Sequence, residues 1–351
     1  MFVLRPAVVN APHRVTTDEI RRALHRVQPD HPHRRLFDRV AGSIGVDVRY
    51  FSEPLEVASA PAPLPERTRT AWEHLRDHGV EAARQAMAEH GLDAQDIDVV
   101  VTSHATGDRK PGLDLALINE LGLKPTVRRV PMTQHACGGG TQSLIQAANM
   151  IDAGRGRTAL VVVAETLSTV YHYSDVTRES VVFKFLFGDS GAAAIVTADK
   201  PADRPCLEVL DTYEMVLPGT THYYQQRIEP DGWHFDSTRE AVEATSVVMP
   251  HVVKWLTEGD PAWTAGHVVA HPGGPKVLDS VEAALGCAPE VMRHSRASMR
   301  DGGNRGGAAV LDVLRLALSD PDLAASTGLI VSFAPGFSTA ALRTRAHLPV
   351  R

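Results

Sequence analysis

One cysteine in the sequence has surroundings that suit a nucleophile. Cys137 lies in the segment HACGGG, directly before an apolar pattern that predicts a helix over residues 141–154. The N-terminal end of a helix lowers the pKa of a thiol, and the thiolate is the nucleophilic form. Glycines let backbone N–H groups approach a reacting thioester closely. A cysteine near glycines can also be an inert buried residue, which is how we interpret Cys206 and Cys287, because they lack this setting.

Two further residues could stabilise charge on a substrate oxygen. His271 ends a β-rich run and precedes the turn PGG, and Asn304 lies between two glycine pairs in GGNRGG. Each signal is weak alone, because the chain has 17 histidines and an asparagine among glycines can be a simple turn residue. Together, a neutral imidazole and an amide can donate hydrogen bonds to one thioester oxygen. Such donors stabilise the enolate that forms when a carboxylate leaves.

The elements that must position these residues occur twice in the same order. Each copy contains a β-rich run, a helix, a glycine-rich turn, a second helix and a second β-rich run. The first copy comprises residues 97–103, 113–122, 136–140, 141–154 and 158–165, and the second comprises 266–271, 275–286, 302–307, 308–318 and 328–334. This order predicts an α/β protein made of two βαβαβ-type halves, each with a mostly parallel sheet covered by helices. Two unrelated α/β domains are the alternative.

Duplication would bring the candidate residues together. Loops that follow parallel strands gather at the carboxyl ends of those strands, where α/β folds bind ligands. Cys137, His271 and Asn304 all lie in such loops, and Cys137 and Asn304 occupy matching places in the two copies.

Composition excludes several classes of protein. The chain has 351 residues with a net charge of −6, which gives no overall attraction to nucleic acid or to an anionic membrane. No apolar run approaches the roughly 20 residues that span a bilayer, and the N-terminal residues do not resemble a signal peptide. The three cysteines lack C-x-x-C spacing, so neither a disulfide scaffold nor a thiolate metal site is expected. These features predict a cytoplasmic protein.

Several motifs carry a resemblance to a known family. The segments HPGGPKVLDSVEAALG (271–286), GGNRGGAAVLDVLR (302–315) and FLFGDSGAAAIV (185–196) resemble motifs of type III polyketide synthases, the chalcone-synthase-like enzymes. Segments 34–56 and 332–338 also fit, so the resemblance covers nearly the whole chain. It implies a duplicated thiolase fold in five α-β-α-β-α layers, with halves at 1–205 and 206–351. It also implies a homodimer.

The resemblance assigns roles to individual residues. Cys137 matches the nucleophile, and His271 and Asn304 match the pair that promotes decarboxylation and binds the oxyanion. The matched positions that would line the substrate pocket are Phe187 and Phe235, which guard its entrance, and the loop from Phe333 to Gly336. Arg34, Arg35 and Arg39 match basic residues that hold coenzyme A, although a solvated helix face explains them equally well.

Three positions depart from the family pattern. The nucleophile motif ACGGG is locally more similar to that of β-ketoacyl synthase III enzymes. Arg305 follows the asparagine where the family has an apolar residue, so it either binds a substrate carboxylate in the pocket or is paired structurally. Lys110 replaces an apolar residue that some plant members project across the dimer interface. These departures argue against iterative extension of an aromatic starter.

The combined features predict decarboxylative Claisen condensation of an acyl starter with a malonyl-type thioester. No metal or redox cofactor is required, and the acyl groups would arrive on coenzyme A or on an acyl carrier protein. One alternative is transfer of the acyl group from Cys137 to an oxygen, nitrogen or sulfur acceptor without decarboxylation. A catalytically silent partner subunit and a cysteine hydrolase are further alternatives, and the intact set of three residues argues against the former.

Overall fold

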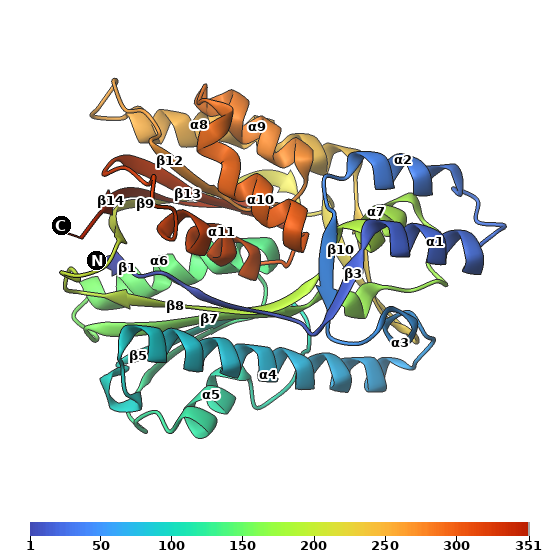
Figure 1. Ribbon diagram of the computed structural model, residues 1–351, viewed down its shortest axis with the longest axis horizontal. Helices are drawn as coiled ribbons and strands as arrows, with labels where there is room; N and C mark the ends of the chain where they lie inside the picture. Colours follow the sequence, from blue (N-terminus) through green and yellow to red (C-terminus); the bar gives the residue numbers. More distant parts are fainter. Residues whose placement is uncertain (350–351) are drawn as a thin grey trace.

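The computed structural model describes residues 1–349 and shows five alternating layers of helices and strands (Figure 1). One outer layer contains α4 (Leu64–His90) and α5 (Leu113–Leu121). The central layer contains α6 (Gly139–Asp152) and α11 (Ala308–Leu318), which lie between the strands of the two halves. The opposite outer layer contains α8 (Arg239–Thr257), α9 (Pro275–Leu285) and α10 (Arg293–Gly302).

The strands of the N-terminal half follow the spatial order β6, β5, β7, β8. Their bounds are Arg128–Met132, Val99–Ser103, Thr158–Thr166 and Asp189–Thr197. Strand β5 pairs in parallel with both β6 and β7, whereas β8 runs antiparallel to β7. On its other edge, β8 pairs with β2 (Ala7–Asn10).

The C-terminal half repeats part of this arrangement, namely two neighbouring parallel strands followed by an antiparallel one. Its strands are β12 (His267–Ala270), β13 (Thr327–Ala334), β14 (Gly336–His347) and β9 (Cys206–Thr220). Strands β12 and β13 are parallel, while β14 is antiparallel to both β13 and β9. The short strand β1 (Phe2–Val3) bonds to β8 and to β9, so one sheet continues from one half into the other.

The prediction of a mostly parallel sheet was therefore wrong for the C-terminal half, where β12–β13 is the one parallel pair among the described residues, whereas two of the three pairings in the order β6, β5, β7, β8 are parallel. Only Pro335 separates β13 from β14, and so short a connection can join only antiparallel neighbours. The connection from β7 to β8 stays at the carboxyl end of β7, so β8 returns in the opposite direction. The predicted parallel pairs β5–β7 and β12–β13 are present in both copies.

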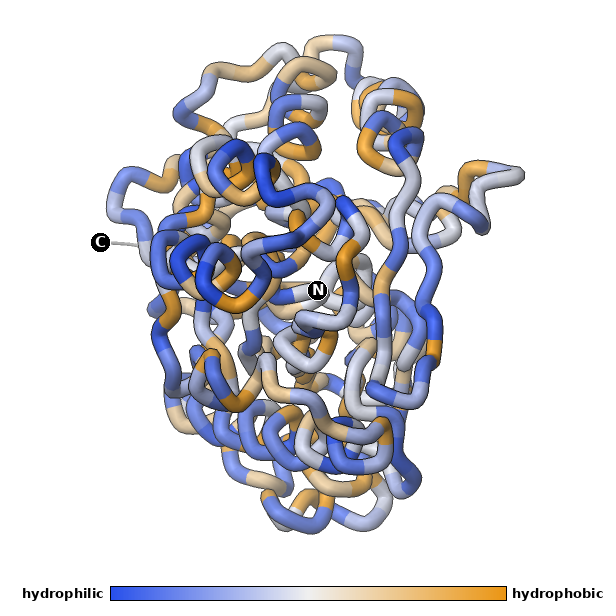
Figure 2. The backbone as a smooth tube through the Cα atoms, turned by 90° about the vertical axis from the view of Figure 1, so that its right-hand side faces the viewer, coloured by the Kyte–Doolittle hydropathy of each residue, from blue (hydrophilic) through white to orange (hydrophobic). Residues whose placement is uncertain are grey.

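The hydrophobic pattern explains the layering. Strands β7 and β8 are buried almost along their whole length because helices cover both of their faces. In α4 and α8 polar residues are interspersed with buried, mainly apolar ones, as expected for outer helices, and Figure 2 shows this mixture along the outer turns of the tube. The central helix α11 is apolar on almost all sides, and nine of its residues are buried.

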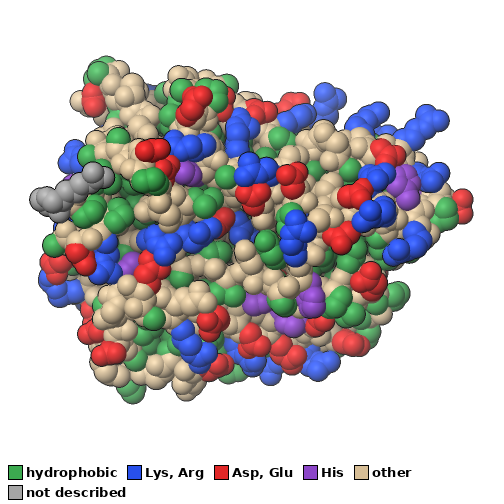
Figure 3. Space-filling view, in the orientation of Figure 1, with side chains coloured by type: hydrophobic (Ala, Val, Ile, Leu, Met, Phe, Trp, Pro, Cys, Tyr) green, Lys and Arg blue, Asp and Glu red, His purple; other side chains and the backbone are tan. Residues whose placement is uncertain are grey.

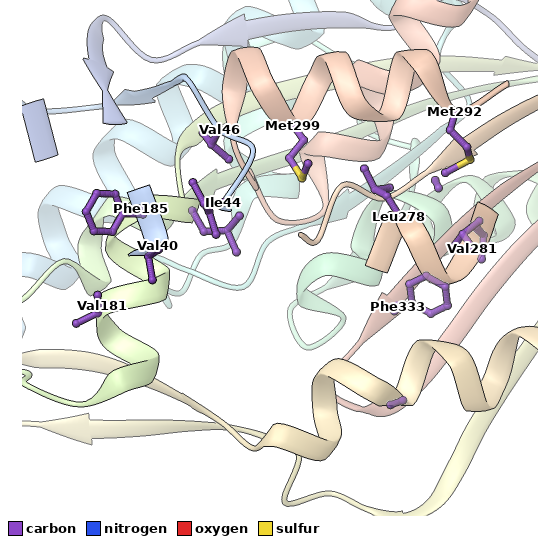
Figure 4. Packing of buried hydrophobic residues seen from close by; sticks show 14 of the residues in the cluster. Val40, Ile44, Val46, Val181, Phe185, Leu278, Val281, Met292, Met299 and Phe333 are labelled. Carbon is purple, nitrogen blue, oxygen red and sulfur yellow. The ribbon is translucent and has the colours of Figure 1, made fainter. Parts of the chain in front are cut away.

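Additional elements cover the carboxyl ends of the strands. They are α1 (Thr17–Val27), α2 (Arg35–Ser43), α3 (Leu55–Ala58), α7 (Arg178–Leu186), β3 (His13–Thr16), β4 (Val48–Phe51), β10 (Tyr224–Glu229) and β11 (Gly232–Ser237). A continuous hydrophobic cluster joins α2 and α7 to the C-terminal half. Figure 4 shows Val40 and Ile44 beside Val181 and Phe185, with Phe333 farther along the same cluster.

Among the described residues, no helix combines the length and the apolar character that a membrane span requires.

Candidate active site

Cys137 lies where the backbone is strained at the start of the central helix. It belongs to the 3-10 turn η2 (Ala136–Gly138), which leads directly into α6. Ala136 has a φ of 40°, which is rare for a residue with a side chain. Such strain persists only where surrounding structure enforces it, and it is concentrated at functional sites.

The glycines after Cys137 are required by close packing between the two halves. A Cβ atom at Gly138 would lie 2.9 Å from the Cβ of Ala334, and one at Gly140 would lie 2.2 Å from the carbonyl oxygen of Gly307. The start of α6 therefore contacts the loop before α11 through backbone atoms. This contact brings the cysteine of one half to the asparagine of the other.

The side-chain amide of Asn304 has a fixed orientation. Its backbone N–H donates to Leu186 (2.9 Å), and its carbonyl accepts from Gly188 (3.0 Å). The side-chain Oδ1 accepts a hydrogen bond of 2.9 Å from the N–H of Gly306, which identifies Nδ2 as the atom that donates towards Cys137. Nδ2 lies 3.7 Å from the sulfur of Cys137. The amide donor and the thiol are therefore adjacent.

His271 directly follows β12, and it lines the same cavity as Cys137 and Asn304. Its backbone N–H donates to Val331 (2.8 Å), and only 2% of the residue is exposed. Among the described residues, neither ring nitrogen has a hydrogen-bond partner. Burial lowers the pKa of His271 to about 3, so the imidazole is neutral at physiological pH.

The electrostatics of Cys137 differ from the sequence-based expectation. Burial raises the pKa of the thiol to about 12, and the contact with Asn304 offsets only part of this increase. The expected lowering by the helix N-terminus is outweighed, because none of the residues that the structure describes places a cation beside the sulfur in its apolar surroundings. The resting site thus contains a neutral thiol and a neutral imidazole, and the sulfur becomes nucleophilic as its proton moves to a base.

A cavity of about 100 Å³ joins the three residues. Cys137, His271 and Asn304 all contribute to its wall, as do Phe187, Phe235 and Phe333, and the remaining wall is mainly apolar. The rings of Phe187 and Phe235 meet edge to face at a centroid distance of 6.3 Å. Gly336 does not line the cavity, although its neighbours Pro335 and Phe337 do.

The structure does not bring Arg305 to the cavity. Its side chain is buried, donates to Asn10 (3.0 Å) and Ser298 (2.8 Å), and forms an ion pair with Asp312. The charge of this buried arginine is therefore balanced by Asp312, which agrees with the interpretation that Arg305 is paired structurally. The placement gives no support to the other, in which Arg305 binds a substrate carboxylate in the pocket.

The predicted coenzyme A residues lie away from the cavity wall. Arg34, Arg35 and Arg39 are exposed at the start of α2 and along it. Figure 3 shows Lys and Arg side chains gathered at the end of the molecule that carries α1 and α2. Such a surface suits phosphate groups, but it would look the same as a solvated helix face.

The sequence analysis missed Glu165, a fully buried carboxyl group in the cavity wall. Burial raises its pKa to about 8, although it accepts hydrogen bonds from the N–H of Ala105 and the hydroxyl of Thr106. At neutral pH the carboxyl group is therefore mostly protonated. The signal for this residue was the sequence TALVVVAE, in which an acidic residue ends a buried strand.

The comparisons with known proteins agree with this geometry. Residues 52–200 match the N-terminal domain of chalcone and stilbene synthases, and residues 208–346 match the C-terminal domain. The chain therefore belongs to the chalcone and stilbene synthase family, and the predicted resemblance is confirmed.

Individual relatives cover nearly the whole chain. Germicidin synthase from Streptomyces coelicolor, a type III polyketide synthase, is 33% identical, with a TM-score of 0.93 and 99% of each chain covered. The 1,3,6,8-tetrahydroxynaphthalene synthase of the same organism is 29% identical over 95% of this chain and 89% of that protein. Phloroglucinol synthase from Pseudomonas fluorescens is 26% identical over 95% of both. These matches confirm the predicted thiolase-type fold.

Proposed function

We propose that the protein is an acyl-thioester condensing enzyme of polyketide biosynthesis. In this reaction an acyl group carried by Cys137 is joined to the two-carbon unit of a malonyl-type thioester, with loss of carbon dioxide. The observation that supports this most strongly is the convergence of Cys137, His271 and Asn304 on one buried cavity. The structurally similar germicidin synthase is itself a type III polyketide synthase.

The first half-reaction loads the enzyme. The neutral imidazole of His271 accepts the proton of Cys137, and the sulfur attacks the carbonyl carbon of the acyl thioester. The carbon–sulfur bond of the donor then breaks, and its thiolate receives the proton from His271. Division into two acyl-transfer steps replaces one difficult reaction by two easier ones. The raised thiol pKa keeps the unloaded cysteine protonated, so the thiolate forms only with this proton transfer.

The second half-reaction forms the carbon–carbon bond. The malonyl carboxylate leaves as carbon dioxide, and its electron pair moves onto the thioester, where the oxygen becomes negative. Nδ2 of Asn304 and a ring N–H of His271 can donate hydrogen bonds to that oxygen, and burial strengthens these bonds. The enolate carbon then attacks the acyl group on Cys137 and releases the sulfur as a thiolate, which takes up one proton from solvent to restore the thiol. Each step balances without a redox cofactor or a metal.

The thioester carrier and the final acceptor are further parts of this proposal. In this proposal the exposed Arg34, Arg35 and Arg39 hold the phosphates of coenzyme A, or the same face receives an acyl carrier protein. The β-ketoacyl synthase III character at Cys137 is a local feature of the ACGGG motif. Transfer to an oxygen, nitrogen or sulfur acceptor is the second candidate function, but it gives the fixed donor of Asn304 no evident task. We also expect the enzyme to act in the cytoplasm.

A product assay tests this function. The protein is incubated with a malonyl thioester and a panel of acyl thioesters, and the products are identified by mass. We expect products heavier than the starter acyl group by the mass of one or more two-carbon ketide units. Starter groups appearing unextended on an alcohol, amine or thiol would instead support the second candidate.

We further propose that the enzyme is a homodimer. Strand β6 is the edge of the sheet, so one side of its backbone has no strand partner among the described residues. An open edge next to the loop that carries Cys137 is a natural place for a second copy. Sedimentation at micromolar concentration should give about twice the chain mass of 38.0 kDa. A fully active monomer would contradict this proposal.

A further inference from the structure

Three polar side chains that the structure places in the cavity wall take no part in the proposed mechanism. They are Glu165, Tyr224 and Thr245. The carboxyl group of Glu165 already accepts hydrogen bonds from the segment that follows β5. Tyr224, at the start of β10, lies near the sulfur, because burial and, to a lesser extent, Cys137 raise the pKa of its phenol to about 12. Thr245 is the side chain that remains to be explained.

Thr245 interrupts an otherwise apolar helix face. It is buried on α8, and every other buried residue of this helix is apolar. Val248, Met249 and Val252, which follow it on the same face, belong to the hydrophobic cluster that α8 shares with α9. Thr245 is also the one residue of α8 that lines the cavity in the part of the chain that the structure describes.

The hydroxyl group of Thr245 has no hydrogen-bond partner among the described residues, although the side chain is fully buried. A threonine inside a helix can donate to the carbonyl four positions earlier, but Thr245 makes no such bond to Ala241. A buried hydroxyl without a partner destabilises a folded protein, whereas a valine of nearly the same shape would not. A ligand that enters the cavity therefore explains the hydroxyl better than the fold does.

Thr245 and Cys137 reach the cavity from different layers of the fold. Cys137 precedes α6 in the central layer, whereas α8 belongs to an outer layer, and the strands of the C-terminal half lie between these layers (Figure 1). Phe333 on β13 and Phe337 on β14 also contribute to the wall. An acyl group bound to Cys137 therefore meets Thr245 with atoms beyond its thioester group.

A chain that grows by condensation carries a matching acceptor at such a position. Each condensation turns the carbonyl group held on Cys137 into a ketone, two carbons away from the new thioester carbonyl. A ketone oxygen only accepts hydrogen bonds, and a threonine hydroxyl can donate one. An unextended aliphatic starter has no oxygen beyond its thioester. The hydroxyl of Thr245 can therefore distinguish an extended chain from such a starter.

We propose that Thr245 is a specificity-determining residue that donates a hydrogen bond to a ketone oxygen of the extended chain. This bond holds the chain in the cavity for the next condensation, so it increases the share of longer products. The inference rests on the proposed condensing function, because only condensation places ketone oxygens along the acyl chain.

The test is the variant Thr245→Val, which replaces the hydroxyl by a methyl group. Products are identified by mass, and the longest is compared with all shorter ones, the released starter included. We expect this ratio to fall about two- to tenfold, the usual effect of one hydrogen bond on an equilibrium constant. Acylation of Cys137 should keep its wild-type rate. The melting temperature should be equal or higher, because the variant lacks an unpartnered buried hydroxyl.

Two matched variants control this experiment. Thr245→Ser keeps the hydroxyl and loses a methyl group, so it should retain most of the wild-type ratio. Ser246→Ala removes an exposed hydroxyl from the same helix and should match the wild type. A fall of equal size in Thr245→Ser and Thr245→Val would show that the shape of the cavity sets the ratio, and it would overturn the role of the hydrogen bond.

The remaining outcomes separate the inference from the function. Condensation products in the wild-type ratio from Thr245→Val would contradict the role of Thr245 and leave the proposed function intact. A lower melting temperature of this variant would show that the hydroxyl stabilises the fold itself, which would also overturn the inference. Absence of any condensation product from the wild-type protein would refute the proposed function.

Discussion

Replacement of Cys137 by alanine is expected to abolish covalent loading and all product formation. The other two cysteines cannot substitute for it. Cys206 is buried in the hydrophobic cluster beneath α4 and α5, and Cys287 packs against the cluster that joins α2 and α7 to the C-terminal half. Neither cysteine contributes to the cavity that His271 and Asn304 line. Loading is measured as the increase in intact protein mass after incubation with an acyl thioester.

Two matched variants control this experiment. Cys206→Ala and Cys287→Ala remove a thiol outside the cavity and should load to the same extent as the wild type. Acylation that persists in Cys137→Ala would show that another residue is the nucleophile. The same loss in all three variants would indicate a defect in folding instead of chemistry.

Asn304→Ala is expected to slow decarboxylation of a malonyl thioester by on the order of a hundred- to a thousandfold, the typical effect of losing one preorganised oxyanion donor. The effect on acylation of Cys137 should be much smaller. Nδ2 of Asn304 is oriented by the hydrogen bond from Gly306 to Oδ1, so it is ready to meet the negative oxygen of the enolate. Both rates are measured on the same preparation, one as carbon dioxide release and the other as mass increase.

The variant His271→Ala provides the comparison for the prediction on Asn304. His271→Ala should slow both rates, because in the proposed mechanism His271 accepts the thiol proton and also donates to the enolate oxygen. Equal losses of both rates in Asn304→Ala would mean that Asn304 merely maintains the contact between Leu186, Gly188 and the loop before α11. That result would contradict a separate role in decarboxylation.

The arrangement of the proposed catalytic residues could be predicted because it depends on chain order. A strand, a loop and a helix in sequence place the loop at the carboxyl end of the strand, and two copies of this pattern place Cys137 and Asn304 in equivalent positions. The direction of β14 could not be predicted from hydrophobic pattern, because a buried strand has the same composition in either direction. The single-residue connection at Pro335 decides it.

The roles of individual charged residues were harder to predict because they depend on partners distant in sequence. Arg305 is adjacent to Asn304, yet its side chain bonds to Asn10 on β2 and to Asp312 on α11. Glu165 enters the cavity only because β7 ends there. The raised pKa of Cys137 likewise results from burial by residues of both halves. The sequence pattern around the cysteine indicates only a helix start, so it could not predict this burial.

The most direct test of the central claim is release of labelled carbon dioxide by the wild-type protein. A malonyl thioester labelled in its free carboxyl group is supplied together with acyl thioesters and with candidate oxygen and nitrogen acceptors. The proposed mechanism predicts that labelled carbon dioxide is released in step with extended product, and that Asn304→Ala suppresses both. Transfer of the acyl group from Cys137 to an oxygen or nitrogen acceptor, with no labelled carbon dioxide from any malonyl-type thioester, would contradict condensation and identify the protein as an acyltransferase.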